Sequence, residues 1–123
     1  MKLKDGTYIS WWPSNSRTDF TFGKKLPIYT ATPNPNQTYA NDVSSEGQKP
    51  NHVINIKGLN EAAIKKWWID FKKKNKWKTF SQNCSSTIAD GLDAGGGGKG
   101  VYWSDWNLIW APDDVKAYAE ALQ

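Results

Sequence analysis

The single cysteine of the chain, Cys84, has the side chain and the setting of a catalytic nucleophile. It lies between Asn83 and Ser85, at the start of a short predicted helix. The positive end of a helix dipole and the free backbone N–H groups of a first turn favour a thiolate. The same N–H groups can hold an oxyanion. The sequence therefore predicts a cysteine nucleophile supported by Asn83 and Ser85. The alternative interpretation is a small buried side chain on the apolar face of that helix.

A nucleophilic cysteine needs a base, which is usually a histidine held close to the sulfur. His52 is the sole histidine, and it precedes Cys84 in the chain. Only an arrangement with the base before the nucleophile is therefore open to this sequence. The alternative interpretation of His52 is an exposed residue at the start of a strand. One histidine and one cysteine also exclude a zinc site of ordinary composition, so no metal or other cofactor is predicted.

The chain has eight tryptophans, which are candidates both for the core and for a binding groove. Trp11 and Trp12 are adjacent in a predicted strand, so they point to opposite faces and one of them belongs to the core. Trp67 and Trp68 lie on the apolar stripe of a predicted helix and are assigned to the core. Trp12 and Trp103 are the predicted groove residues, where aromatic rings could stack on a sugar or another substrate.

Length and composition limit the class of protein. The 123 residues fit a single domain, residues 1–123, with little room for a second one. The net charge is +4, and all but one of the 16 basic residues are lysines. Because arginine is the residue that recognises phosphate in a bidentate manner, nucleic acid is not a favoured partner. A mean hydropathy of -0.72 and the lack of a long apolar run predict a soluble chain without a membrane span. The polar start of the sequence does not resemble a signal peptide.

Extended structure is expected in the first half of the chain. Asp5 and Gly6 form a turn signal, which predicts a β-hairpin over residues 1–13 whose first arm is short. Four prolines and many small polar residues predict loop rather than long helix over residues 14–50, apart from a short strand near residues 26–29. β-Branched residues predict a strand over residues 52–57, and a short extended piece is expected over residues 77–80.

Three helices are expected to position the cysteine. Apolar residues at helical spacing and suitable capping residues predict helices over residues 60–74, 84–94 and 113–122. Glycines 95–98 end the second of these and are assigned to a flexible connection, because they lack the spacing of a phosphate loop. The predicted fold class is α+β, with a small antiparallel sheet made by the hairpin and the strand over residues 52–57, packed by the three helices.

Short motifs along the chain resemble those of the circularly permuted papain-like cysteine hydrolases, the group that includes NlpC/P60-related and lecithin:retinol acyltransferase-like proteins. The motifs are Asp-Gly with a following Ser-Trp-Trp-Pro, Gly-Leu-Asn-Glu opening a Trp-bearing helix, and Asn-Cys-Ser opening a helix that ends in Ala-Gly-Gly. They cover most of the chain from Leu3 to Gly96. The resemblance implies that Cys84 is the nucleophile and that Ser10 is nearest to the polar residue that orients the catalytic histidine.

In that family the histidine lies just upstream of the hairpin turn, at a point about three residues before Met1. Three explanations stay open: the parent protein supplies this histidine, and the chain lacks an N-terminal strand; the chain is an inactive homologue; or His52 substitutes. The resemblance implies a thiol hydrolase or amidase that acts on a peptide or peptidoglycan amide. Bacterial relatives include delivered antibacterial toxins, for which a specialised secretion system and an inhibitor or immunity protein are expected. The alternative function is a binding module with an aromatic groove and no catalysis.

Overall fold

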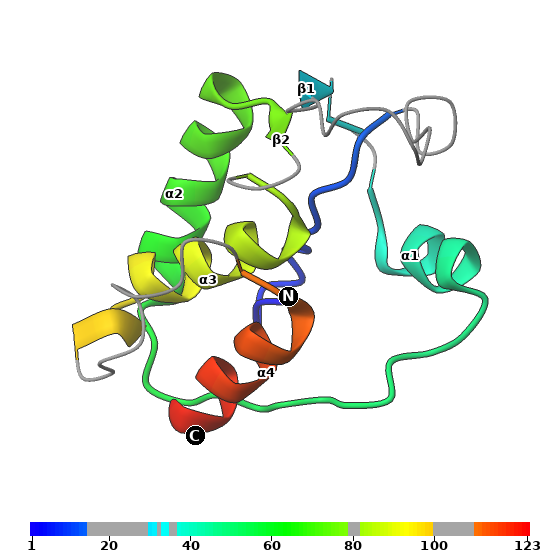
Figure 1. The fold of residues 1–123 in the computed structure, drawn as a ribbon. Coiled ribbons are helices and arrows are strands. Elements are labelled where there is room, and N and C mark those ends of the chain that lie inside the picture. Colours follow the sequence, from blue (N-terminus) through cyan, green and yellow to red (C-terminus); the bar gives the residue numbers. More distant parts are fainter. Residues whose placement is uncertain (15–29, 32, 35–36, 79–81, 100–109) are drawn as a thin grey trace.

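The computed structural model describes residues 1–14, 30–31, 33–34, 37–78, 82–99 and 110–123. Helices dominate these residues, and α2, α3 and α4 lie side by side with the N-terminal segment beside them (Figure 1). The elements in chain order are β1 (Thr30–Ala31), α1 (Tyr39–Glu46), α2 (Glu61–Lys74), β2 (Trp77–Lys78), α3 (Cys84–Ala94), the short 3-10 helix η1 (Gly97–Lys99) and α4 (Pro112–Ala121).

Helix α2 forms where the sequence predicts it. The side chain of Asn60 caps it by accepting a hydrogen bond from the backbone N–H of Ala63, at 3.0 Å. Its apolar stripe buries Ile64, Trp68 and Phe71. Three lysines occupy its last turn, where positive charge complements the helix dipole. The helix thus presents an aromatic face to the core and a basic face to solvent.

One core cluster is built around Trp11, which is only 2 % exposed. Its ring packs edge-on against the rings of Trp68 and Phe71, with distances between ring centroids of 5.7 Å and 4.9 Å. Such edge-to-face contacts add to the gain from burying large apolar rings. Trp12 is half-buried, so the expectation that one of the two adjacent tryptophans is core and the other partly exposed is confirmed. Trp67 is half-buried and packs against the edge of this cluster rather than within it.

Helices α3 and α4 join in a second cluster, and their bounds confirm the predicted helices. Pro112 begins α4, and the Asp114 carboxylate accepts a hydrogen bond from the backbone N–H of Ala111 at 2.9 Å. Tyr118 of α4 is buried, and its hydroxyl donates a hydrogen bond to the Asp93 carboxylate of α3. Burial and this carboxylate hold the pKa of Tyr118 above its usual range. The phenol therefore remains a hydrogen-bond donor that ties the two helices together.

The glycine run after α3 is packed more closely than a flexible connection would be. Gly95 is buried, and a Cβ atom placed there would lie 2.7 Å from Cδ1 of Ile64 in α2. Its carbonyl also accepts a hydrogen bond from the backbone N–H of Asn60 at 2.9 Å. The prediction that the run ends α3 is confirmed, but its assignment to a flexible connection is wrong at Gly95. The absence of a side chain there lets α2 and α3 approach closely.

The predicted sheet is not found. The turn at Gly6 forms, with a φ of 90°, but the hairpin has a single bridge between Lys2 and Tyr8. Residues 52–57 have no strand partner among the described residues. The sheet that the structure does describe pairs β1 with β2 in antiparallel register. The α+β class therefore holds only in its coarse form, and of the predicted extended piece over residues 77–80 the structure describes β2. The strand expected near residues 26–29 lies outside the described residues.

Helix α1 occupies part of the segment that the sequence assigns to loop. The Thr38 hydroxyl caps it by accepting a hydrogen bond from the backbone N–H of Asn41 at 3.2 Å. Gly47 ends it with a left-handed φ of 70°, which favours glycine. The helix buries none of its own residues, so the sequence has no apolar stripe that would predict it. The loop assignment is wrong here because the capping residues, and not a hydrophobic period, define the helix.

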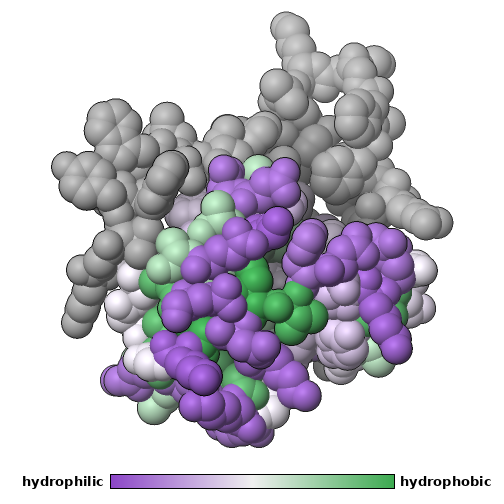
Figure 2. Space-filling model, turned by 90° about the horizontal axis from the view of Figure 1, so that it is seen from below, coloured by the Kyte–Doolittle hydropathy of each residue, from purple (hydrophilic) through white to green (hydrophobic). Residues whose placement is uncertain are grey.

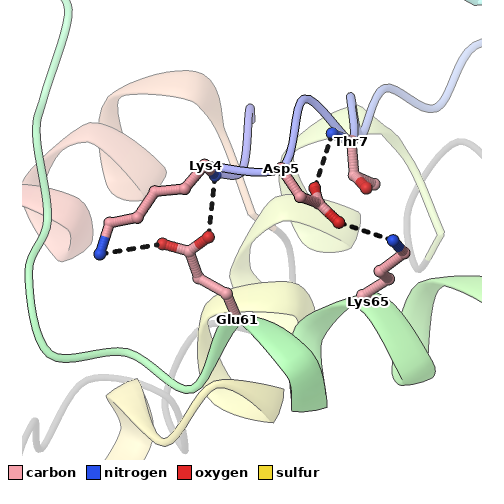
Figure 3. A network of polar contacts seen from close by, with 5 residues as sticks. All are labelled: Lys4, Asp5, Thr7, Glu61 and Lys65. Carbon is pink, nitrogen blue, oxygen red and sulfur yellow. Dashed lines mark hydrogen bonds and ion pairs between the residues drawn. The ribbon is translucent and has the colours of Figure 1, made fainter.

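Polar contacts fix the N-terminal turn on α2 (Figure 3). The Lys65 ammonium donates to the Asp5 carboxylate at 2.6 Å, and the backbone N–H of Lys4 donates to the Glu61 carboxylate at 2.8 Å. The bond from Lys65, together with that from Thr7, holds the pKa of Asp5 well below its usual range. Because the pKa is lowered in the folded state, the pair stabilises the fold above the ordinary aspartate pKa of about 4 and loses this effect as the pH falls.

Candidate functional site

Cys84 is the first residue of α3, and it is half-buried. The Asn83 side chain caps the helix by accepting a hydrogen bond from the backbone N–H of Ser86 at 2.8 Å. The predicted supporting residue Ser85 is buried, and its hydroxyl oxygen lies 4.0 Å from the Cys84 sulfur. Cys84, Asn83 and Ser85 are therefore brought together at one helix end, as the sequence predicts.

The first turn of α3 is unusual because it buries polar side chains. Ser86 and Thr87 are 5 % and 0 % exposed, and both hydroxyls donate to the backbone carbonyl of Asn83, at 3.1 and 2.8 Å. These bonds satisfy the buried hydroxyls and hold the Asn83 backbone on the helix end. The backbone N–H groups of Cys84 and Ser85 have no acceptor among the described residues, as expected for a first turn.

His52 lies in an extended, exposed stretch of the chain. It lines a pocket of about 320 Å³ together with Ile88 of α3 and residues from the N-terminal segment and α4. In the described part of the chain, no hydrogen bond joins His52 to Cys84. The structure thus places the predicted base on a pocket that α3 also lines but shows no hydrogen bond between it and the thiol among the described residues, and its role as base stays a prediction.

Ser10 belongs to a polar cluster that the sequence did not reveal. Its hydroxyl donates to the Asp42 carboxylate of α1 at 2.7 Å, and the Tyr8 hydroxyl donates to the same oxygen at 2.5 Å. The Gln37 amide donates to the other oxygen of Asp42. We call these four residues the Asp42 cluster. Burial and the Asp42 carboxylate raise the pKa of Tyr8 above its usual range, so the phenol stays a donor.

Sequence reasoning missed Asp42 because its partners are distant in the chain. Tyr8 lies 34 positions and Ser10 lies 32 positions from it. The available signal was the pair of α1 capping residues, Thr38 and Gly47, which place Asp42 in the first turn of a helix. No hydrogen bond links the Asp42 cluster to Cys84 within the described ranges. The predicted role of Ser10 as an orienting residue therefore stays a prediction, and Ser10 is itself oriented by Asp42.

The predicted groove residue Trp12 does line a pocket. This pocket has a volume of about 420 Å³, and Asn34, Gln37 and Glu46 are also part of its wall. A half-buried tryptophan beside amide and carboxylate side chains is a surface on which a polar ring or peptide can stack. The second predicted groove residue, Trp103, lies outside the described residues.

The described residues offer neither a metal site nor a membrane-spanning helix. No group of three or more histidine, cysteine, aspartate or glutamate side chains there is placed to hold a metal ion. Among the helices described, none has both the length and the apolar character that a bilayer crossing requires.

The structure thus describes a helical α+β unit with a capped, half-buried cysteine at the start of α3. Comparison with protein families identifies the family of this chain. The model of the IcsB middle domain matches residues 46–123, which include α2, α3 and α4 together with His52 and Cys84. The chain belongs to the IcsB middle domain family.

Two curated relatives are large bacterial toxins. The chain is 34% identical over 74 residues to a multifunctional-autoprocessing repeats-in-toxin of Vibrio vulnificus, and the match covers 57% of this chain and 1% of the toxin. A toxin of the same name from Vibrio cholerae serotype O1 matches with 34% identity over 74 residues, which is 57% of this chain and 2% of the toxin. The chain therefore spans only a very small part of these relatives. No solved structure matches it significantly.

These comparisons support the expectation of similarity to bacterial toxins. They leave the resemblance to permuted papain-like hydrolases untested, and they show no substrate, partner or reaction.

Proposed function

We propose that this chain is the nucleophile-bearing part of a delivered bacterial effector or toxin, and that it acts as a papain-like thiol hydrolase or acyltransferase through Cys84. The observation that carries the proposal is the position of the thiol. Cys84 is half-buried at the start of α3, with the Asn83 cap beside it and two backbone N–H groups free of acceptors among the described residues. Similarity to two Vibrio toxins supports the effector context.

In the proposed reaction the Cys84 sulfur attacks a carbonyl carbon of the substrate. A carbon–sulfur bond forms, and the carbonyl oxygen gains negative charge, which the N–H groups of Cys84 and Ser85 would stabilise. The bond to the leaving group then breaks, and the leaving group departs with a proton. Water or another acceptor resolves the resulting thioester. The proposed substrate is an amide in a peptide or in peptidoglycan, and His52 is the proposed base within this chain.

The other two groups of site residues have supporting roles in the proposal. Ser10, held by Asp42 at 2.7 Å, is the proposed orienting residue for a base. Trp12 is the proposed contact for the substrate, since it lines a pocket of about 420 Å³. An inhibitor or immunity protein is the proposed partner if the toxin acts on bacteria, and a specialised secretion system is the proposed route of delivery.

A second candidate function is a binding module that uses the Trp12 pocket without catalysis. The pocket volume of about 420 Å³ favours it, since it falls in the range of roughly 300–1,000 Å³ that is typical of ligand sites. In this alternative Cys84 has no chemical role. The two candidate functions differ in one expected reaction: the hydrolase transfers an activated acyl group to the Cys84 sulfur, and the binding module does not.

The proposed chemistry is tested with p-nitrophenyl acetate, an activated ester. We expect a fast release of about one equivalent of p-nitrophenolate per chain, because the sulfur takes the acetyl group and expels the phenolate. Cys84→Ala is expected to remove this burst and to leave only slow background release. Cys84→Ser keeps the shape but has a weaker nucleophile, and is expected to behave like Cys84→Ala. An equal burst from the alanine variant would reject the thiol mechanism and favour the binding module.

A further inference from the structure

A second pocket, independent of the thiol, lies between the N-terminal segment and the last turns of α2. It has a volume of about 360 Å³, which lies within the range of ordinary small-molecule sites. Its apolar wall includes Trp11, Pro33, Trp68 and Ile69. Trp68 is buried, whereas Ile69 is 43 % exposed on the surface of α2. This wall therefore offers an aromatic and aliphatic surface against which an aromatic ring can pack.

Three polar residues that line this pocket are bonded to a carboxylate outside its lining. Tyr8, Ser10 and Gln37 line it, and all three donate their hydrogen bonds to Asp42. Donors committed in this way are not available to a ligand. The half-buried Asp42 charge to which they donate also disfavours an anionic group beside these three residues.

The part of the pocket that α2 lines carries two ammonium groups. Lys72 and Lys73 both line the pocket and are exposed, and neither pairs with a carboxylate among the described residues. The Lys72 ammonium lies 5.2 Å from the centroid of the Trp68 ring, so it is held over the apolar wall. Two adjacent positive charges that pair with none of the described carboxylates, next to an aromatic wall, are complementary to a negatively charged group.

We propose that this pocket binds an aromatic anion, that is, a flat apolar ring system with one acidic group. The ring lies against Trp68 and Ile69, and the acidic group meets the ammonium groups of Lys72 and Lys73. The Asp42 cluster fixes this orientation, because its carboxylate repels the acidic group from the residues that donate to it. This site does not depend on Cys84 or on the proposed hydrolase function.

The proposal is tested with two fluorescent compounds that share a ring system. Anilinonaphthalene sulfonate carries a negative charge, and N-phenyl-1-naphthylamine has the same aromatic body without it. Binding of each is measured by fluorescence titration on the folded chain. We expect Lys72→Gln with Lys73→Gln to weaken binding of the sulfonate about tenfold, as two exposed charge contacts of modest strength would. Binding of the neutral amine is expected to change less than about twofold.

Two controls separate the pocket from general effects. Lys66→Gln with Lys74→Gln removes the same charge from α2 at exposed positions that do not line the pocket, and is expected to leave both affinities unchanged. Ile69→Gln is expected to weaken both compounds, because both use the apolar wall. Circular dichroism confirms that each variant is folded. Equal losses for both lysine pairs, or no loss for either pair, would overturn the proposal.

Discussion

Cys84 is expected to react with iodoacetamide at pH 6 at least about tenfold faster than the same thiol in the urea-unfolded chain. The reason is the proposed role of the sulfur, because a side chain that attacks a carbonyl carbon from the start of α3 is also expected to attack the carbon of iodoacetamide. The unfolded chain is the reference because it carries the same thiol without the helix start. The rate is followed by mass spectrometry of the intact chain.

Substitutions at Asn83 separate the helix end from simple exposure of the sulfur. Asn83→Ala removes the acceptor for the Ser86 backbone N–H, which is bonded at 2.8 Å, and is expected to lower helix stability by about 1 kcal/mol. Fraying of the first turn should bring the alkylation rate down towards that of the unfolded chain. Asn83→Ser keeps a capping oxygen and is expected to retain most of the rate. A thiol as slow in the folded chain as in urea would contradict the assignment of Cys84 as a nucleophile.

Replacing Trp11 with alanine is expected to lower the free energy of unfolding by about 3 to 5 kcal/mol, as large-to-small changes of buried aromatic residues do. Trp11 is 2 % exposed and meets both Trp68 and Phe71 edge-on, so its removal leaves a cavity in the middle of the first core cluster. A small domain has only about 5 to 15 kcal/mol of stability in total. The variant should therefore be close to unfolded at moderate temperature, as a urea titration would measure.

Trp12→Ala is the matched control for this change. It removes the same side chain from the neighbouring position, where the ring is half-buried and lines a pocket. We expect a loss well below that of Trp11→Ala, since part of its surface is already in contact with water. Equal losses of unfolding free energy for the two variants would contradict the assignment of Trp11 to the core and of Trp12 to the groove.

The helices around the thiol could be predicted because their signals are local. Asn60 and Asn83 are good capping residues, and apolar residues recur at helical spacing in α2 and α4. The sequence therefore locates Cys84 at a helix start without any knowledge of tertiary contacts. The interpretation of Trp11 and Trp12 succeeds for the same reason, since alternation along an extended segment is local as well.

The sheet and the Asp42 cluster could not be predicted because they depend on distant pairs. β1 and β2 are short strands that pair Ala31 with Trp77 across a long stretch of chain. The β-branched residues over 52–57 predict a strand, but the structure gives these residues no regular secondary structure, because propensity does not supply a strand partner. The Asp42 carboxylate likewise accepts hydrogen bonds from Tyr8 and Ser10, which lie outside its own helix and far from it in the sequence.

The central claim, that the Cys84 sulfur accepts an acyl group, is tested most directly by locating the acetyl group after reaction with p-nitrophenyl acetate. The chain is quenched in acid, digested and mapped by tandem mass spectrometry, with hydroxylamine treatment to identify a thioester. We predict that the acetyl group lies on Cys84, is released by hydroxylamine and is absent from the chain unfolded in urea before the reaction. An unmodified Cys84, with acetyl groups only on lysine side chains, would contradict the claim.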